Sequence, residues 1–130
     1  MVGEIEARLK ALDLVLPEAR AAIGSYAHFL HIDRQLIISG QLPLVDGKIA
    51  IAGKVGAELD LDKGREAARL CALNILAQAK AALRDLDRIV QLVRLNGFVN
   101  SAPGFTDANK GDYKAALDAA VEVDAIFAID

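Results

Sequence analysis

The sequence predicts an α/β fold of the two-layer α+β type, with one mixed sheet and helices packed on one of its faces. Three observations lead to this class. Residues 62–83 carry apolar side chains at helical spacing, residues 26–52 hold short β-rich runs between turn residues, and residues 121–129 alternate along a strand. The predicted order of elements is α-β-β-β-α-β-(α)-β.

The composition favours one domain, residues 1–130, that hides apolar surface between subunits. Hydrophobic residues make up 54% of the chain, which is high for a small monomer. No apolar run approaches the roughly 18 residues of a membrane span. The start, MVGEIEARLK, has no apolar signal region, and the single Cys71 fits a reducing compartment, so we expect a cytoplasmic protein. A net charge of −3 makes nucleic acid an improbable partner.

The first part of the chain predicts a short helix and then three strands. The helix follows from apolar residues at steps of three and four, namely Val2, Ile5, Leu9 and Leu12. Residues 26–32 and 35–41 predict a hairpin around the turn Asp33-Arg34. A second turn at Asp46-Gly47 leads to a strand over residues 48–52.

The helix over residues 62–83 is the element that should cover the sheet. Its buried stripe is rich in alanine, and small side chains let a helix lie close to a flat partner. Asp62 is the predicted cap, because its side chain can accept from free N–H groups of the first turn. The stripe consists of Ala68, Cys71, Ala72, Ile75, Ala79, Ala82 and Leu83.

The remainder predicts two strands separated by a loop and a helical turn or two. Residues 89–100 form the first strand, residues 101–110 the loop, residues 113–120 the turns and residues 121–129 the last strand. In the first strand one face carries Arg94, Asn96, Phe98 and Asn100. In the last strand Val121, Val123, Ala125, Phe127 and Ile129 share one face, and Glu122, Asp124, Ile126 and Ala128 share the other.

Glu122 and Asp124 are the residues whose spacing could carry chemistry. Two carboxylates on one strand face can share a proton, and burial can raise the pKa of one of them towards neutrality. The alternative is a pair of solvated charges on an open face. Which reading holds depends on whether another subunit covers that face.

Other residues that could bind a metal, act as a nucleophile or hold a phosphate give weaker indications of a functional site. His28 and His31 should point to opposite faces of a strand, so no metal site is predicted. Cys71 lies on the packed stripe and is predicted to be a buried structural thiol. Ser39 lacks the surroundings of a hydrolase nucleophile, and residues 53–56 (GKVG) lack the spacing of a phosphate loop.

Six stretches together resemble the YjgF/Rid family, which is also labelled endoribonuclease L-PSP. They are GSY (24–26), SGQLP (39–43), GKVG (53–56), AARLCALN (67–74), GFVN (97–100) and VEVDAI (121–126). The resemblance covers about residues 20–110 and 118–129. The subgroup with A-A-R-x-C-A-L-N and V-N-S-A-P-G-F is the most similar.

The resemblance implies a chorismate-mutase-like fold and a homotrimer with small-molecule clefts between subunits. Deaminating members hydrolyse enamines and imines to keto acids and ammonia without a cofactor. In them an Arg binds the substrate carboxylate and a Glu on the last strand positions the attacking water. By position Glu122 matches that Glu. The cleft-lining positions match Tyr26, Ser39, Gly40, Phe98 and Asn100.

The chain departs from the family pattern after Lys110. The resemblance implies a second helix and then a strand bearing the Arg, but here the last strand follows almost at once and Arg94 is the last arginine. A helix and a strand are therefore expected to be missing, and an internal deletion, a gap in the sequence and a degenerate relative all fit this departure. If the chain is truly this short, the last strand is expected to have an unpaired edge.

Three functions stay open on the sequence. The first is an imine or enamine hydrolase in which Lys110 or Lys114 supplies a point charge instead of a guanidinium. The second is a trimer that binds a small carboxylate or hydrophobic metabolite without turning it over. The third, a ribonuclease, ranks last, because an acidic chain with its two histidines on opposite strand faces offers no evident pair for RNA cleavage.

Overall fold

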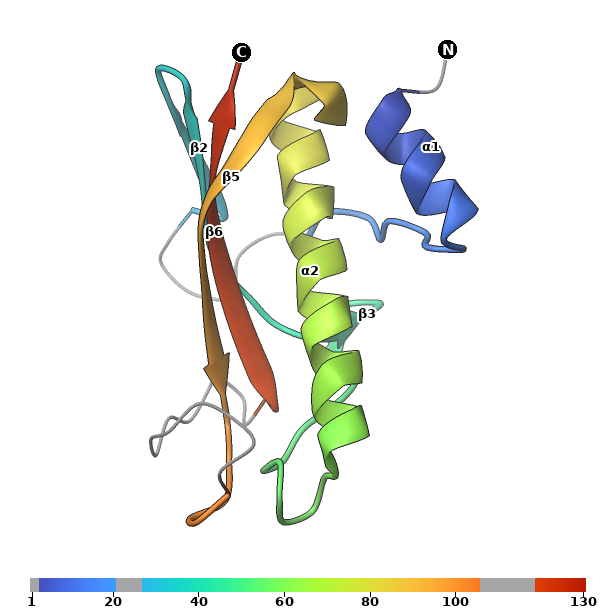
Figure 1. The fold of residues 1–130 in the computed structure, drawn as a ribbon, viewed down its shortest axis with the longest axis vertical. Helices are drawn as coiled ribbons and strands as arrows, with labels where there is room; N and C mark the ends of the chain where they lie inside the picture. The colour runs from blue at the N-terminus through green and yellow to red at the C-terminus, as the bar shows by residue number, and fades with distance from the viewer. Residues whose placement is uncertain (1–2, 21–26, 106–118) are drawn as a thin grey trace.

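One long helix lies across one face of a four-stranded sheet (Figure 1). The computed structural model describes residues 3–20, 27–105 and 119–130. The helix is α2 (Leu61–Leu83), and the strands run in the order β1-β2-β6-β5. Their bounds are β1 (Phe29–Ile32), β2 (Gln35–Gln41), β5 (Ile89–Val99) and β6 (Val121–Ile129). The predicted two-layer class is confirmed.

The sheet is antiparallel in all three of its described pairings, where we expected a mixed sheet. The hairpin at Asp33-Arg34 makes β1 and β2 antiparallel, and β6 lies between β2 and β5 and runs opposite to both. The last strand therefore has two paired edges, so the predicted unpaired edge on it is wrong. Among the described strands, β5 lies at one end of the sheet and β1 at the other.

A small second sheet follows β2. It pairs β3 (Leu44–Val45) with β4 (Lys48–Ile49), which is shorter than the strand predicted over residues 48–52. The predicted turn is confirmed: Asp46 and Gly47 have φ values of 52° and 79°. Positive φ at both central residues is what a tight two-residue hairpin requires, since its twist then matches that of the flanking strands.

Helix α2 packs on β6 and β2 through small side chains. Cys71, Ile75, Ala79 and Leu83 of the predicted stripe are buried, which confirms that a stripe with small side chains faces the sheet. Ala72 is exposed, so its place in the stripe was wrong, and Ala67, which was not predicted, is fully buried instead. The helix begins one residue earlier than predicted. Its cap is Asp60, whose Oδ1 accepts from Lys63 N at 2.8 Å, and not Asp62. Both aspartates lie in the same short acidic stretch, so periodicity alone could not choose between them.

Strand β6 confirms the alternation read from the sequence. Its inward side chains are all buried, namely Val121, Val123, Ala125, Phe127 and Ile129. The outward ones are half-buried, namely Glu122, Asp124, Ile126 and Ala128. The face of the sheet opposite α2 is called the outer face below, and it carries both carboxylates of this strand.

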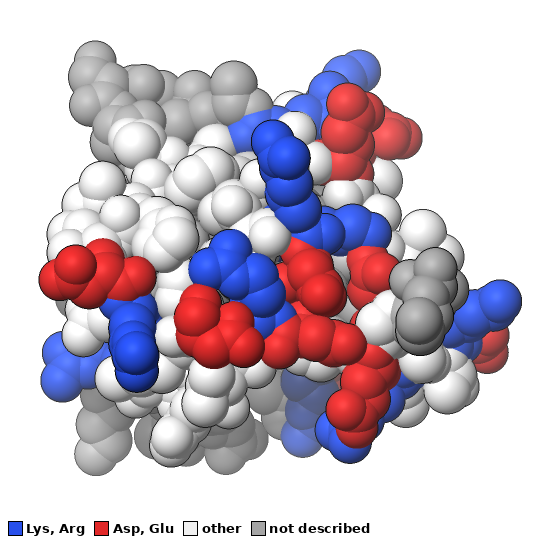
Figure 2. Space-filling model, turned by 90° about the horizontal axis from the view of Figure 1, so that it is seen from above, with Lys and Arg blue, Asp and Glu red and all other residues white. Residues whose placement is uncertain are grey.

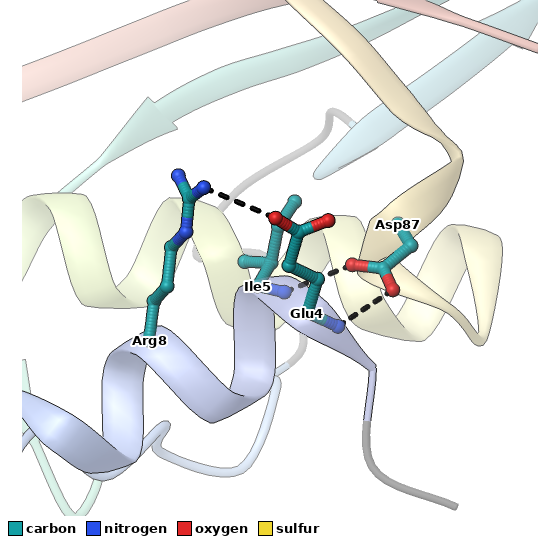
Figure 3. A network of polar contacts seen from close by, with 4 residues as sticks. All are labelled: Glu4, Ile5, Arg8 and Asp87. Carbon is teal, nitrogen blue, oxygen red and sulfur yellow. Dashed lines mark hydrogen bonds and ion pairs between the residues drawn. The ribbon is translucent and has the colours of Figure 1, made fainter.

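The N-terminal helix α1 (Glu4–Ala11), which the sequence predicted, is held by Asp87, a residue just beyond the end of α2 (Figure 3). Asp87, in the 3-10 turn η1 (Leu86–Arg88), accepts from Glu4 N at 2.7 Å and from Ile5 N at 2.9 Å. These two hydrogen bonds, first that of Ile5 and then that of Glu4, lower the pKa of Asp87, and Arg8 adds a smaller effect. A carboxylate thus caps a helix start that has no side-chain cap of its own.

Replacing Asp87 with Ala is expected to loosen α1 without unfolding the sheet. The amides of Glu4 and Ile5 lose their acceptors, so their hydrogen exchange should accelerate selectively. Because the folded pKa is depressed, this contact stabilises α1 above the usual aspartate pKa of about 4 and is lost as pH falls through the depressed value. Residue-resolved exchange between pH 2 and pH 7 checks both statements. Exchange at Glu4 and Ile5 that matches wild type would contradict them.

Candidate functional site

The predicted site residues that the structure brings together lie on the outer face. Glu122 on β6 is the cross-strand partner of Phe98 on β5. Asn96 and Asp124 form the next outward pair, and Asn96 Nδ2 donates to Asp124 Oδ1 at 2.9 Å. Two adjacent strands therefore present an aromatic ring, an amide and two carboxylates on one surface.

Gly40 on β2 makes room for the Glu122 carboxylate. A Cβ added at Gly40 would lie 2.6 Å from Glu122 Oε1 and 3.0 Å from Glu122 Cδ. Such distances are shorter than van der Waals contact, so a side chain at this position would displace the carboxylate. The pairing of β2 with β6 shifts register between Ile38 and Gln41, and Gly40 lies within this irregular stretch.

Polar side chains fix the end of β2 around Gly40. Ser39 Oγ lies 2.7 Å from Ala27 O and 2.9 Å from His28 O, so its hydroxyl can donate to either carbonyl. The buried amide of Gln41 donates from Nε2 to His28 Nδ1 at 3.0 Å and to Ser39 O at 3.1 Å. Sequence reasoning did not single out Gln41 or His28 for this role, although Gln41 belongs to the SGQLP stretch.

A family model described as "YjgF/chorismate_mutase-like, putative endoribonuclease" matches residues 6–127. The chain belongs to this family. The YjgF assignment confirms the resemblance noted in the sequence, and the antiparallel sheet under a long helix agrees with the family's fold.

Three similar proteins illustrate the range of similarity to this YjgF-family chain. The Agrobacterium tumefaciens protein Atu1372, of unknown function, is 40% identical with a TM-score of 0.87, over 97% of this chain and 92% of its own. Protein TCP17 of Trypanosoma cruzi is 44% identical over 105 residues, 81% of this chain, and the match spans 66% of TCP17. Escherichia coli TdcF with bound serine is 18% identical, TM-score 0.59, over 87% of this chain and 94% of its own, and shows the fold alone.

Asn100, a predicted cleft residue of this YjgF chain, lies in the interior. It is 1% exposed, and its Nδ2 donates to Gly53 O at 3.1 Å. Its main chain bonds to Val55 N and Ala120 O, both at 2.8 Å. Asn100 thus ties the loop after β4 to the end of β5, and direct contact with a ligand stays a prediction.

Three of the sequence-based predictions for this YjgF chain fall wholly or mostly outside the described residues. Tyr26 is one, and its place in the cleft stays a prediction. The second is the short segment between Lys110 and Leu117, where a helix and an arginine-bearing strand were expected to be missing. The third is the set of helical turns predicted over residues 113–120, which lie mostly in the same undescribed stretch.

Cys71 is a structural thiol, as predicted. It is fully buried under the sheet, and its Sγ donates to Val121 O at 3.5 Å. Burial, and to a lesser extent the negative charge of Glu122, raises the pKa of Cys71 to about 12. The thiol is therefore protonated at neutral pH and is not a nucleophile.

The described residues gather no group of side chains suited to a metal ion, and on the face seen in Figure 2 positive and negative side chains are interspersed. Within residues 3–20, 27–105 and 119–130, no three His, Cys, Asp or Glu side chains come together to hold a metal ion. Seen from above, Lys and Arg side chains alternate with Asp and Glu (Figure 2). Several form ion pairs, such as Arg8–Glu4 and Arg88–Asp130. None of the described helices has the length and apolar character to cross a membrane.

Proposed function

We propose that this YjgF-family chain binds a small carboxylate-bearing enamine or imine on the outer face and hydrolyses it to a keto acid and ammonia. The observation that supports this most directly is the space that Gly40 leaves for the Glu122 carboxylate. Phe98 beside it offers an apolar wall. A carboxylate held between a glycine and an aromatic ring suits a small, flat substrate.

Glu122 acts as the general base in the proposed reaction. Its carboxylate accepts a proton from a water molecule while the water oxygen forms a bond to the C=N carbon. The C=N π electrons pass to nitrogen, which takes up a proton, and a carbinolamine results. Collapse of this intermediate breaks the C–N bond and releases ammonia, leaving the C=O of a keto acid. An enamine substrate first gains a proton on carbon and loses one from nitrogen to become the imine.

Three copies of the chain complete the proposed cleft. The outer face presents apolar side chains, among them Ile37, Ile126 and Phe98, and in the described residues no helix lies over it (Figure 1). Burying this face between subunits removes apolar surface from water and places the carboxylates in a seam where the dielectric is low. We therefore propose a cytoplasmic homotrimer with its sites at the subunit boundaries.

The direct test is ammonia release from an imino acid generated freshly in the assay. Wild-type protein is expected to accelerate release over the rate in buffer, and heat-denatured protein is the control for contaminating amines. No acceleration across several imino acids would overturn the hydrolase proposal. RNA binding that weakens steeply with salt would favour the ribonuclease reading instead.

Gly40→Ala is expected to lower the rate while leaving the fold intact. The new Cβ displaces Glu122 Oε1, and the Glu122 side chain can rotate away because it is flexible. Misplacing a catalytic group by about 1 Å can lower a rate about 10²-fold. Steady-state kinetics and the melting temperature together check this. A Gly40→Ala enzyme as fast as wild type would contradict the placement of Glu122.

A second candidate, a non-catalytic trimer that binds the same class of metabolite, is favoured by one observation: no arginine follows Arg94 in the sequence. Without the family guanidinium the substrate carboxylate loses a bidentate partner. This alternative predicts that carboxylates raise the melting temperature with no ammonia release.

A further inference from the structure

The N-terminal half of β5 leaves one edge of the sheet open. Strand β5 pairs with β6 on one side, and no described strand pairs with its other edge. Side chains in this half are well exposed, with Leu92 at 45%, Val93 at 56% and Leu95 at 56%. Helix α2 packs mainly on β6 and β2, and these side chains of β5 stay about half exposed.

This edge lacks most features that protect natural edge strands. Such strands are usually short or carry Lys, Pro or several charges. Strand β5 has 11 residues, no proline and no lysine, and Arg94 is its single charged residue. Its one protective feature is a pair of register shifts against β6, at Ile89/Gln91 and Leu92/Arg94. Over residues 89–96 no other described strand lies along this edge, and a row of N–H and C=O groups flanked by apolar side chains fits a further strand better than it fits a helix.

We propose that residues 89–96 pair antiparallel with the same residues of a second copy of this chain. With the pairing centred between Val93 and Arg94, Leu92 lies opposite the partner's Leu95. Both residues pair with the inward positions Phe127 and Ala125 of β6, so the two leucines meet on one face. On the other face Gln91 lies opposite the partner's Asn96. The pairing therefore places leucine opposite leucine on one face and amide opposite amide on the other.

Charge and strand length favour pairing β5 with the β5 strand of a second copy over pairing it with another copy's β1. Arg94 lies opposite the partner's Val93 and not directly opposite itself, a placement that avoids destabilising like-charge contact. The other edge of the described sheet, β1, has only 4 residues, so pairing β5 with another copy's β1 is short and leaves an open chain of subunits. Pairing β5 with β5 uses one edge from each copy and closes as a two-fold dimer.

This pairing uses the strand edge and is separate from the outer face proposed to form the trimer. Combined with the homotrimer proposed above, this pairing joins two trimers into an assembly of six copies, and without the trimer contact it gives two, so the number of copies is even in both cases. A trimer alone, or a monomer, excludes the proposal.

Leu95→Lys tests the pairing by placing two lysines at the seam. Analytical ultracentrifugation of wild type is expected to give an even number of copies, and Leu95→Lys to halve that number. The matched control is Leu12→Lys, because Leu12 is 68% exposed and lies beyond α1, away from the sheet. An odd number of copies in wild type, or an unchanged number in Leu95→Lys, would overturn the proposal.

Cross-linking tests the register without disturbing the charge. An equal mixture of Leu92→Cys and Leu95→Cys proteins is expected to form a disulfide-linked pair on mild oxidation, because opposite Cα atoms of paired strands lie about 4.5–5.5 Å apart. Either variant alone should stay unlinked. Cys71 is buried and does not interfere. No link in the mixture would overturn the proposed pairing.

Discussion

Glu122→Gln is expected to lower the rate of ammonia release by about 10²–10⁴-fold, the usual contribution of a general base. Glutamine keeps the shape of the side chain beside Gly40 but cannot accept the proton of the attacking water. Since Glu122 is half-buried on the outer face and lies away from the core, the variant should fold and assemble as wild type does. The rate should fall through kcat more than through KM, because the lost contact acts in the transition state.

Asp124→Asn is the matched control for this loss. It removes the same charge from the same face of the same strand, two residues away, and its side chain contacts Asn96 and not Gly40. A small effect in Asp124→Asn beside a large one in Glu122→Gln assigns the chemistry to position 122. Equal losses in both variants would instead mean that the negative charge of the face matters, and Glu122 would lose its assigned role.

The elements with strong periodicity could be predicted from the sequence, and their arrangement could not. Strand β6 alternates cleanly because one face meets α2 and the other does not, so its burial follows from pattern alone. Which strand lies beside which is set by tertiary pairing, so β6 was expected at an edge and lies between β2 and β5. Because β6 lies inside the described sheet, the long strand at the end of that sheet is β5.

The site was predictable only through the family resemblance. Gly40 and Glu122 are far apart in the chain, and no spacing rule indicates that a Cβ at one would touch the carboxylate of the other. Asn100 shows the converse limit. The family resemblance places it in the cleft, but its amide also satisfies a buried carbonyl at Gly53, a contact that depends on how the loop returns and that the sequence does not indicate.

Leu36→Ala is expected to lower the free energy of unfolding by about 2–5 kcal/mol, the range for a large buried aliphatic side chain. Leu36 is fully buried on β2, between His31 of β1 and Phe127 of β6, and belongs to the core under α2. Truncation removes apolar contacts and leaves a cavity that the flanking strands cannot close, because their positions are fixed by the ladder. Urea denaturation with an unchanged m-value measures the loss.

Leu12→Ala supplies the comparison, because it makes the same chemical change at a residue that is largely exposed. Its effect should stay within about 0.5 kcal/mol, as for most surface substitutions. Both variants must be compared with wild type at one protein concentration, since assembly stabilises the folded chain by mass action. Similar losses at Leu36 and Leu12 would mean that the sheet and α2 do not form the core that holds Gly40 next to Glu122. A large loss of unfolding free energy in Leu36→Ala alone would mean that the packing of α2 on the sheet stabilises the fold, and this sheet holds Gly40 next to Glu122.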